Sequence, residues 1–284
     1  MPIELTCTSF SFPLLSFEKS LQMISLLEIP KFDVGAHEGA SHVQPSEVET
    51  DPDGVADRIR RAADAAGLRP SDFFATFGHG FRDRPVNTPD GATRAANLRR
   101  FRALVRCAGR EPSGCGAGGI TLLPGVVWDD LGHERSFELA VAGLGELLPI
   151  AQDAGLRLSV EAHLESVAES PELAARLVES VPGLKLTLDY SHFVAGGHPA
   201  ESVDRLLAHA GHFHARQAAD GRLQASSKDG SLRFEEIVGR LRASGYQGDL
   251  CLEYTWQDWR GCWHQDVVSE SIVLRDLLRR VLAG

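Results

Sequence analysis

Two apolar segments of this sequence each end in a carboxylate, and a histidine closely follows the second. The segment LRLSV runs into Glu161, and LKLTL runs into Asp189, with His192 three residues further on. Carboxylates and imidazoles bind divalent cations and exchange protons near neutral pH. A single acid after a strand is ordinary, because it caps the next helix or faces solvent. The chemistry therefore depends on whether other strands end in the same way and at the same place.

The composition describes a globular protein with a sizeable core. The chain has 284 residues, 43% of them hydrophobic, and a formal net charge of −10, which disfavours nucleic acid and anionic membranes as partners. Its five cysteines include no C-x-x-C pair, so neither a disulfide framework nor a thiolate zinc site is indicated. The N-terminus lacks a signal-peptide pattern, and no apolar run reaches the roughly 18 residues of a membrane span. We expect a cytoplasmic protein.

Short apolar runs alternate with segments of helical period along the whole chain. The expected strands cover residues 3–10, 31–35, 73–77, 119–123, 156–161, 184–189, 211–215 and 249–254. The expected helices include residues 54–67, 92–109, 136–155, 171–180, 233–245 and 268–284. Glycines at 67, 155 and 245 mark three of their C-terminal ends. A strand followed by a helix, repeated eight times, predicts an α/β fold: a (β/α)8 TIM barrel in a single domain over residues 1–284.

A doubly wound open sheet is the alternative architecture. Such a sheet would have a glycine-rich phosphate loop after its first strand, where this sequence reads SFSFPLLSF. The barrel is therefore the preferred interpretation.

Four consecutive predicted strands end in groups that bind hard metal ions. In a parallel barrel the C-terminal ends of the strands meet at one mouth. The side chains that we expect there are Glu161, Asp189, His214 and Glu253. Three carboxylates and one imidazole suit a divalent ion, with Mn²⁺ expected first and Mg²⁺, Co²⁺ or Zn²⁺ also compatible. The absence of cysteine from the set disfavours a structural zinc site.

These segments also resemble a known family. The chain resembles the xylose isomerase-like TIM barrel superfamily at VEAH (160–163), LDYSH (188–192), HFHAR (212–216) and CLEY (251–254). This superfamily includes sugar phosphate isomerases and epimerases and AP endonuclease family 2. The segment TSFSFP near the start is similar to its first strand. The resemblance implies the same metal set and prefers His214 to His212 as a ligand. Both histidines nevertheless share one face of the strand, because they are two residues apart.

The resemblance also implies a reaction. His192 would face the substrate, and Glu161 and Glu253 would exchange protons with a substrate carbon from opposite sides. Moving a proton next to a carbonyl requires a base, an acid and a cation near the developing negative charge. The expected function is a metal-dependent isomerase or epimerase that acts on a small polyhydroxylated, carbohydrate-like carbonyl compound through an enediolate.

Three other functions are weighed against this one. A lyase similar to inosose or 3-dehydroshikimate dehydratase would use the same chemistry to eliminate a β-leaving group, and LKLTLDYSHF resembles the sixth strand of the dehydroshikimate enzyme. A non-catalytic subunit or binding module is the second alternative. An AP endonuclease is disfavoured, because Asp229 is followed by glycine and serine where endonuclease IV has a D-x-H pair.

Further side chains near the predicted strand ends are candidates for substrate contact. They are Arg216, His163, His79 and Trp256, with His37, Glu38 and Trp259 as additional loop residues. Each has an ordinary structural alternative: a surface arginine, a solvated loop residue or a tryptophan that covers the core. The sequence leaves open whether the chain forms a homo-oligomer.

Overall fold

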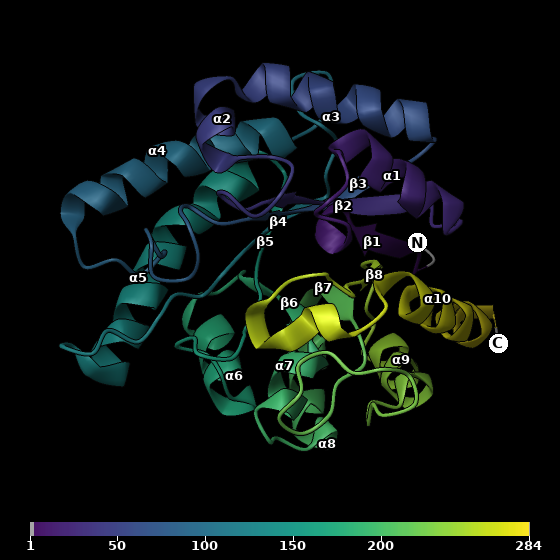
Figure 1. The fold of residues 1–284 in the computed structure, drawn as a ribbon. Helices are drawn as coiled ribbons and strands as arrows, with labels where there is room; N and C mark the ends of the chain where they lie inside the picture. The colour runs from purple at the N-terminus through teal and green to yellow at the C-terminus, as the bar shows by residue number, and fades with distance from the viewer. Residues whose placement is uncertain (1–2, 284) are drawn as a thin grey trace.

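Eight parallel strands close into a barrel in chain order in the computed structural model, which describes residues 3–283 (Figure 1). The strands are β1 (Leu5–Thr8), β2 (Lys31–Ala36), β3 (Arg69–Ala75), β4 (Gly119–Leu122), β5 (Arg157–Val160), β6 (Lys185–Asp189), β7 (Ala210–Ala215) and β8 (Leu250–Leu252). Pairing of β1 with β8 completes the ring. The predicted TIM barrel is therefore confirmed. The predicted bounds of the domain, 1–284, and of the last helix, 268–284, extend into Met1, Pro2 and Gly284, which lie outside the described residues.

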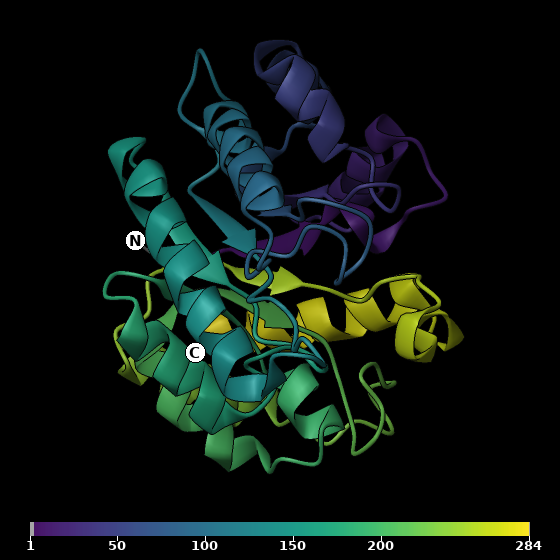
Figure 2. The same ribbon diagram turned by 90° about the vertical axis from the view of Figure 1, so that its left-hand side faces the viewer.

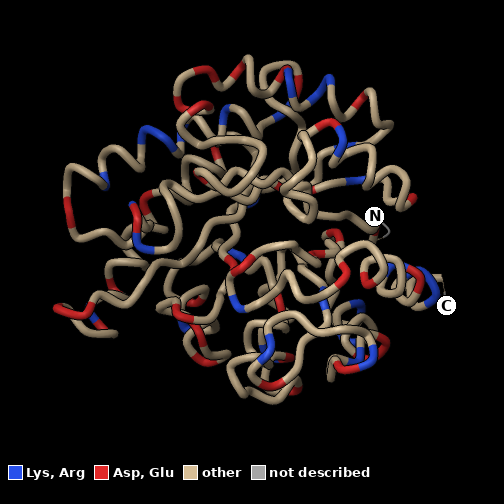
Figure 3. Tube along the Cα trace, viewed as in Figure 1, with Lys and Arg blue, Asp and Glu red and all other residues tan. Residues whose placement is uncertain are grey.

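Helices surround the barrel in both ribbon views (Figures 1 and 2). The α-helices are α1 (Phe17–Leu26), α2 (Pro45–Thr50), α3 (Pro52–Ala66), α4 (Gly91–Ala108), α5 (Gly132–Asp153), α6 (Pro171–Ser180), α7 (Tyr190–Ala195), α8 (Ala200–Val203), α9 (Phe234–Ala243) and α10 (Val267–Ala283). Short 3-10 helices are η1 (Ser9–Ser11), η2 (Asp204–His209) and η3 (Trp259–His264). Figure 3 shows acidic and basic residues interspersed along this outer layer.

Local signals explain where several helices begin and end. The Asp51 carboxylate accepts a hydrogen bond from the Gly54 N–H and caps α3. Gly67 ends the same helix at φ +68°, in the left-handed region that glycine adopts without strain. Gly155 and Gly245 also have positive φ just beyond α5 and α9, as the sequence predicted.

Strand β3 differs most from its prediction. It begins at Arg69, whereas the apolar pattern placed the strand at 73–77. Its first half, RPSD, is polar because this end of the strand lies at the charged bottom of the barrel, where Ser71 donates to Asp249. Strands that end at Val160 and Leu252 also stop one or two residues before their predicted ends, so Glu161 and Glu253 follow the strands directly.

The interior of the barrel is polar, and the apolar strand residues face the helices. Phe32, Phe213 and Leu252 alternate with inward residues and belong to the buried core between strands and helices. Hydrogen bonds cross the lumen between strands that are not neighbours, as from Thr121 on β4 to Thr187 on β6. An outer layer of helices thus supplies the hydrophobic stability and leaves the lumen free for polar groups. Among residues 3–283, no helix is long and apolar enough to span a membrane.

Candidate active site

Three of the predicted ligands converge at the C-terminal ends of their strands. His214 is the next-to-last residue of β7, and its Nδ1 lies 2.6 Å from Glu161 Oε1 and 3.2 Å from Glu253 Oε2. All three side chains are at least 95% buried. Their donor atoms lie within 4.8 Å of one another, which is close enough to share one ion. The structure therefore brings β5, β7 and β8 to one point.

Asp189, the fourth predicted ligand, is held by an arginine in this structure. Its Oδ2 accepts a hydrogen bond of 2.8 Å from Arg216, and its Oδ1 accepts one of 2.8 Å from the Ser191 N–H. Asp189 also forms a second possible ligand group with Glu161 and His192. Glu161 is common to both groups, so they overlap. Coordination of a single ion by all four predicted residues remains a prediction.

Arg216 is a deeply buried arginine at the mouth, with 2% of its surface exposed. Besides the bond to Asp189, it donates to Ser191 Oγ at 2.9 Å and to His192 Nε2 at 3.1 Å. Its terminal nitrogen lies 3.3 Å from Glu253 Oε2. The sequence offered Arg216 as a candidate for substrate contact, with a surface arginine as the alternative. The structure adds that its guanidinium neutralises part of the carboxylate cluster.

The two glutamates experience different electrostatic environments. Burial alone would raise the pKa of Glu161, but the charge of His214 and hydrogen bonds from His192 and His214 hold that pKa well below its ordinary value. Burial raises the pKa of Glu253, and the nearby Glu161 charge adds to the increase against the opposing effect of Arg216. Although burial opposes it, the charges of Glu253 and Glu161 raise the pKa of His214 well above its ordinary value. The cluster therefore combines an ionised carboxylate with one that is easier to protonate.

The glutamates lie at the floor of a cavity of about 510 Å³. This volume is typical of a small-molecule site. Besides Glu161 and Glu253, its walls include the predicted residues His163, His192, Arg216 and Trp256, and also His37, Glu38 and Trp259. His79 is exposed and does not belong to the lining set, so its contact with substrate remains a prediction without support from this cavity.

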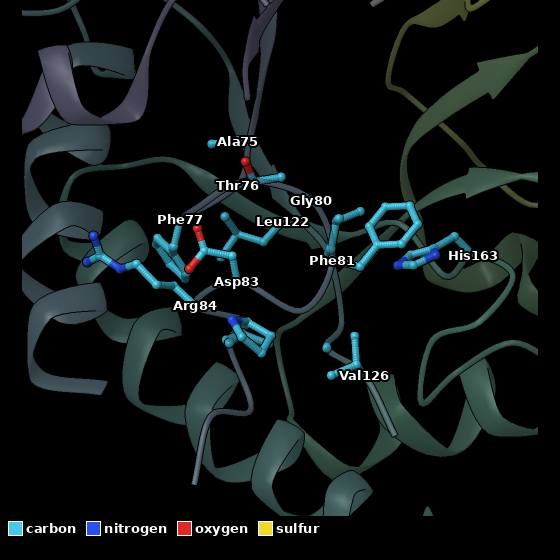
Figure 4. A pocket seen from close by; sticks show the side chains of 14 residues that line it. Ala75, Thr76, Phe77, Gly80, Phe81, Asp83, Arg84, Leu122, Val126 and His163 are labelled. Carbon is cyan, nitrogen blue, oxygen red and sulfur yellow. The ribbon is translucent and has the colours of Figure 1, made fainter. Parts of the chain in front are cut away.

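One wall of the cavity is aromatic. The Phe81 ring lies 4.5 Å from the His163 ring and 5.1 Å from the Trp259 ring, centroid to centroid. Figure 4 shows Phe81 directed toward His163, beside a smaller pocket behind this wall. Trp256 is 44% exposed at the rim. Sequence reasoning missed Phe81, although its position beside glycines in FGHGF is a signal for an exposed aromatic in a loop.

A second cluster lies one layer deeper in the lumen and was also missed. His212 Nε2 lies 2.6 Å from Asp33 Oδ2, so this histidine points into the barrel as its spacing from His214 predicted, but it contacts an acid on β2 rather than the mouth. Asp33 is fully buried. The available signal was an acid in the middle of the apolar strand KFDVGA.

The residues at the mouth fit a divalent cation. Glu253 Oε2 is buried and makes no hydrogen bond, although His214 Nδ1 lies 3.2 Å and the Arg216 guanidinium 3.3 Å from it. Two carboxylates and an imidazole are donors for Mn²⁺, Zn²⁺ and similar ions. An ion among these three side chains would give this oxygen a ligand bond in place of the missing hydrogen bond.

A family model described as xylose isomerase-like TIM barrel matches residues 32–276. The chain belongs to this family. Comparison with curated proteins gave no significant match. The solved structures that share the family's fold include a D-psicose 3-epimerase from Clostridium cellulolyticum H10 with D-tagatose, at TM-score 0.76 and 14% identity, covering 99% of each chain.

Two other solved structures also share this fold. The IOLI protein with a bound zinc atom has a TM-score of 0.72 and 15% identity, covering 99% of this chain and 98% of its own. The probable 3-DHS dehydratase AsbF of Bacillus anthracis has a TM-score of 0.66 and 13% identity, covering 96% of this chain and 99% of its own. At these identities the likeness establishes the fold alone.

Proposed function

We propose that this protein is a metal-dependent isomerase or epimerase that moves a proton next to the carbonyl of a small polyhydroxylated compound. The observation that carries the proposal is the pair of buried glutamates, Glu161 and Glu253, which both contact His214 Nδ1 and line the cavity. The fold is shared with a D-psicose 3-epimerase and a zinc-containing IOLI protein, which supports the same class of chemistry. The metal would be held by Glu161, His214 and Glu253, with Asp189 as the fourth ligand.

The two glutamates would divide the proton transfer. A bound divalent cation supplies polarisation of the substrate carbonyl, which acidifies the neighbouring carbon. Glu161 then removes the proton from that carbon, and Glu253 delivers a proton to the opposite face of the resulting enediolate. Because the two residues directly follow β5 and β8, a substrate between them would expose one face to each. Protonation by Glu253 on that face produces the epimer and leaves the abstracted proton on Glu161.

Neighbouring side chains would orient the substrate. His192 lines the cavity, and its Nδ1 is buried without a hydrogen-bond partner, which suits contact with a substrate hydroxyl. The aromatic wall of Phe81 and Trp259 offers an apolar surface to the C–H face of a sugar-like ring. We therefore assign His192 and this wall to substrate binding.

The charges of the cavity favour an uncharged substrate. Among the described residues that line it, Arg216 is the sole Lys or Arg, and its guanidinium is already bonded to Asp189. A phosphate or carboxylate group on the substrate would therefore meet carboxylates without a free cationic side chain. An unphosphorylated keto-sugar matches this environment best.

Hydrogen exchange tests the reaction directly. The Mn²⁺-loaded protein is incubated with D-fructose, D-tagatose and D-psicose in deuterated water, the ion is removed with chelator, and proton NMR is recorded. We expect deuterium at the carbon next to the carbonyl together with signals of the epimer. D-Fructose 6-phosphate serves as the matched charged substrate and should react more slowly.

The other functions give different results in the same experiment. A lyase produces a conjugated product with a new ultraviolet absorbance band, and a binding module produces neither deuterium incorporation nor absorbance. Absence of exchange with every neutral ketose, from protein that carries the ion, would contradict the proposed reaction.

A further inference from the structure

A buried carboxylate lies on the far side of the histidine that faces the mouth. Asp33 on β2 accepts a hydrogen bond of 3.1 Å from Thr6 Oγ1 at its Oδ1, and its Oδ2 lies 2.6 Å from His212 Nε2. The same Oδ2 lies 3.4 Å from His214 Nε2. Asp33 thus connects β1, β2 and β7 directly beneath the candidate metal site.

The His214 ring faces two groups of acids with its two nitrogens. Nδ1 faces Glu161 and Glu253, whereas Nε2 is buried and makes no hydrogen bond in this structure. A neutral imidazole carries its proton on one nitrogen and offers a lone pair on the other. When Nδ1 binds an ion, the proton must therefore be on Nε2, and Asp33 Oδ2 is the carboxylate next to it.

We propose that Asp33 is a positioning residue for the metal site, which fixes the ring orientation and the tautomer of His214 so that Nδ1 presents its lone pair to the ion. The inference rests on the proposed metal-dependent function. Carboxylates that accept the second N–H of a ligating histidine raise its basicity and hold its ring in place. Thr6 and His212 keep the Asp33 carboxylate fixed by donating to both of its oxygens.

A second ion is the competing interpretation of this deeper cluster. Donor atoms of Asp33, His212, His214 and Cys251 also lie within 4.8 Å of one another. However, both Asp33 oxygens already have donors, and Cys251 Sγ contacts the Leu252 carbonyl oxygen at 3.6 Å. Three of the four members thus already have hydrogen-bond partners, which favours a supporting role over that of a second site.

Asp33→Asn tests this role, because asparagine keeps the shape and removes the charge. Asp72→Asn is the matched control: Asp72 is another buried acid on a strand, but its oxygens pair with Thr121 and Arg157 and contact no histidine. Mn²⁺ affinity is measured by titration calorimetry and ion content by elemental analysis, both without sugar. We expect one ion per chain in every protein, with affinity weakened about 10–100-fold in Asp33→Asn and less than about threefold in Asp72→Asn.

A spectroscopic measurement on the unmodified protein makes the test independent of whether the variant folds. Long-range ¹⁵N NMR of the Zn²⁺-loaded protein reports the tautomer of His214, assigned by its loss in His214→Gln. A proton on Nε2 supports the inference. A proton on Nδ1, unchanged Mn²⁺ affinity in folded Asp33→Asn, or two ions in the native protein with one in Asp33→Asn would each overturn it.

Failure of the inference can be separated from failure of the proposed function. Normal ion affinity in Asp33→Asn together with sugar epimerisation removes only the role of Asp33. A weakened ion affinity in Asp33→Asn without any sugar reaction keeps that role and removes only the proposed reaction.

Discussion

Replacement of Arg216 by methionine tests whether the guanidinium supplies the positive charge that balances the buried carboxylates at the mouth. Methionine keeps much of the apolar stem and removes the charge. In the native protein Arg216 lies 2.8 Å from Asp189 Oδ2 and 3.3 Å from Glu253 Oε2. Its loss would leave three buried acids, Glu161, Asp189 and Glu253, with His214 as the remaining cationic partner close to two of them.

The size of the effect follows from these distances and from burial. Two unit charges about 4 Å apart interact by about 4 kcal/mol at an effective dielectric constant of about 20. Removing one partner of a buried pair typically costs about 3–5 kcal/mol, because the other charge is left unpaired in the interior. We therefore expect Arg216→Met to lower the free energy of unfolding by about 3–5 kcal/mol in the presence of chelator.

Added Mn²⁺ should reduce this loss selectively. A divalent ion at the mouth supplies the positive charge that the acids lack, so the variant should gain more stability from the ion than the native protein does. Urea unfolding with chelator and with saturating Mn²⁺, followed by circular dichroism, measures both gains. We expect at least about half of the loss to be recovered.

Arg100→Met is the matched control. Arg100 is also largely buried and pairs with Glu49 and Glu38, but it contacts none of the predicted ligands. It should lose stability equally with and without Mn²⁺. An equal loss in Arg216→Met under both conditions, or a loss below about 1 kcal/mol, would refute the view that Arg216 compensates the carboxylate cluster.

The remaining predictions concern catalysis, pH and substrate binding. Glu161→Gln and Glu253→Gln should each bind Mn²⁺ and stay folded but lose most turnover. In deuterated water, one variant should exchange hydrogen only in the substrate and the other only in the product. Near-native turnover in both variants would place the proton-transfer pair elsewhere. Burial lowers the pKa of His37 to about 4, below its unfolded value of about 6.5. The free energy of unfolding should therefore decrease as the pH falls through this interval, by about 3 kcal/mol at pH 4. His37→Gln should remove that part of the loss in urea unfolding at pH 7 and pH 4, and an unchanged pH dependence would contradict it. Trp259→Ala should raise KM roughly 2–10-fold with little change in kcat, whereas Trp263→Ala, outside the cavity lining, should leave both constants unchanged in steady-state assays with the active ketose.

The order of strands and helices was readable from local patterns. Helix α6 was predicted with its observed bounds, because Ser170 caps its first turn and Pro171 occupies its first position. The start of β3 was not predicted, because RPSD carries no apolar alternation and becomes extended only by pairing with β2. Strand pairing is a non-local interaction and leaves a weak trace in a polar segment.

The sequence by itself predicted that Glu161, Asp189, His214 and Glu253 gather at one mouth, because parallel strands of a barrel place their C-terminal ends together. It did not determine how these side chains are paired. Arg216 binds Asp189 across 27 residues, and Asp33 meets His212 across 179 residues. Those partnerships depend on which side chains fill the same layer of the lumen, and this is decided by the closure and stagger of all eight strands. Spacing along the chain specifies the face on which a residue lies, whereas the closed barrel alone specifies its partner across the lumen.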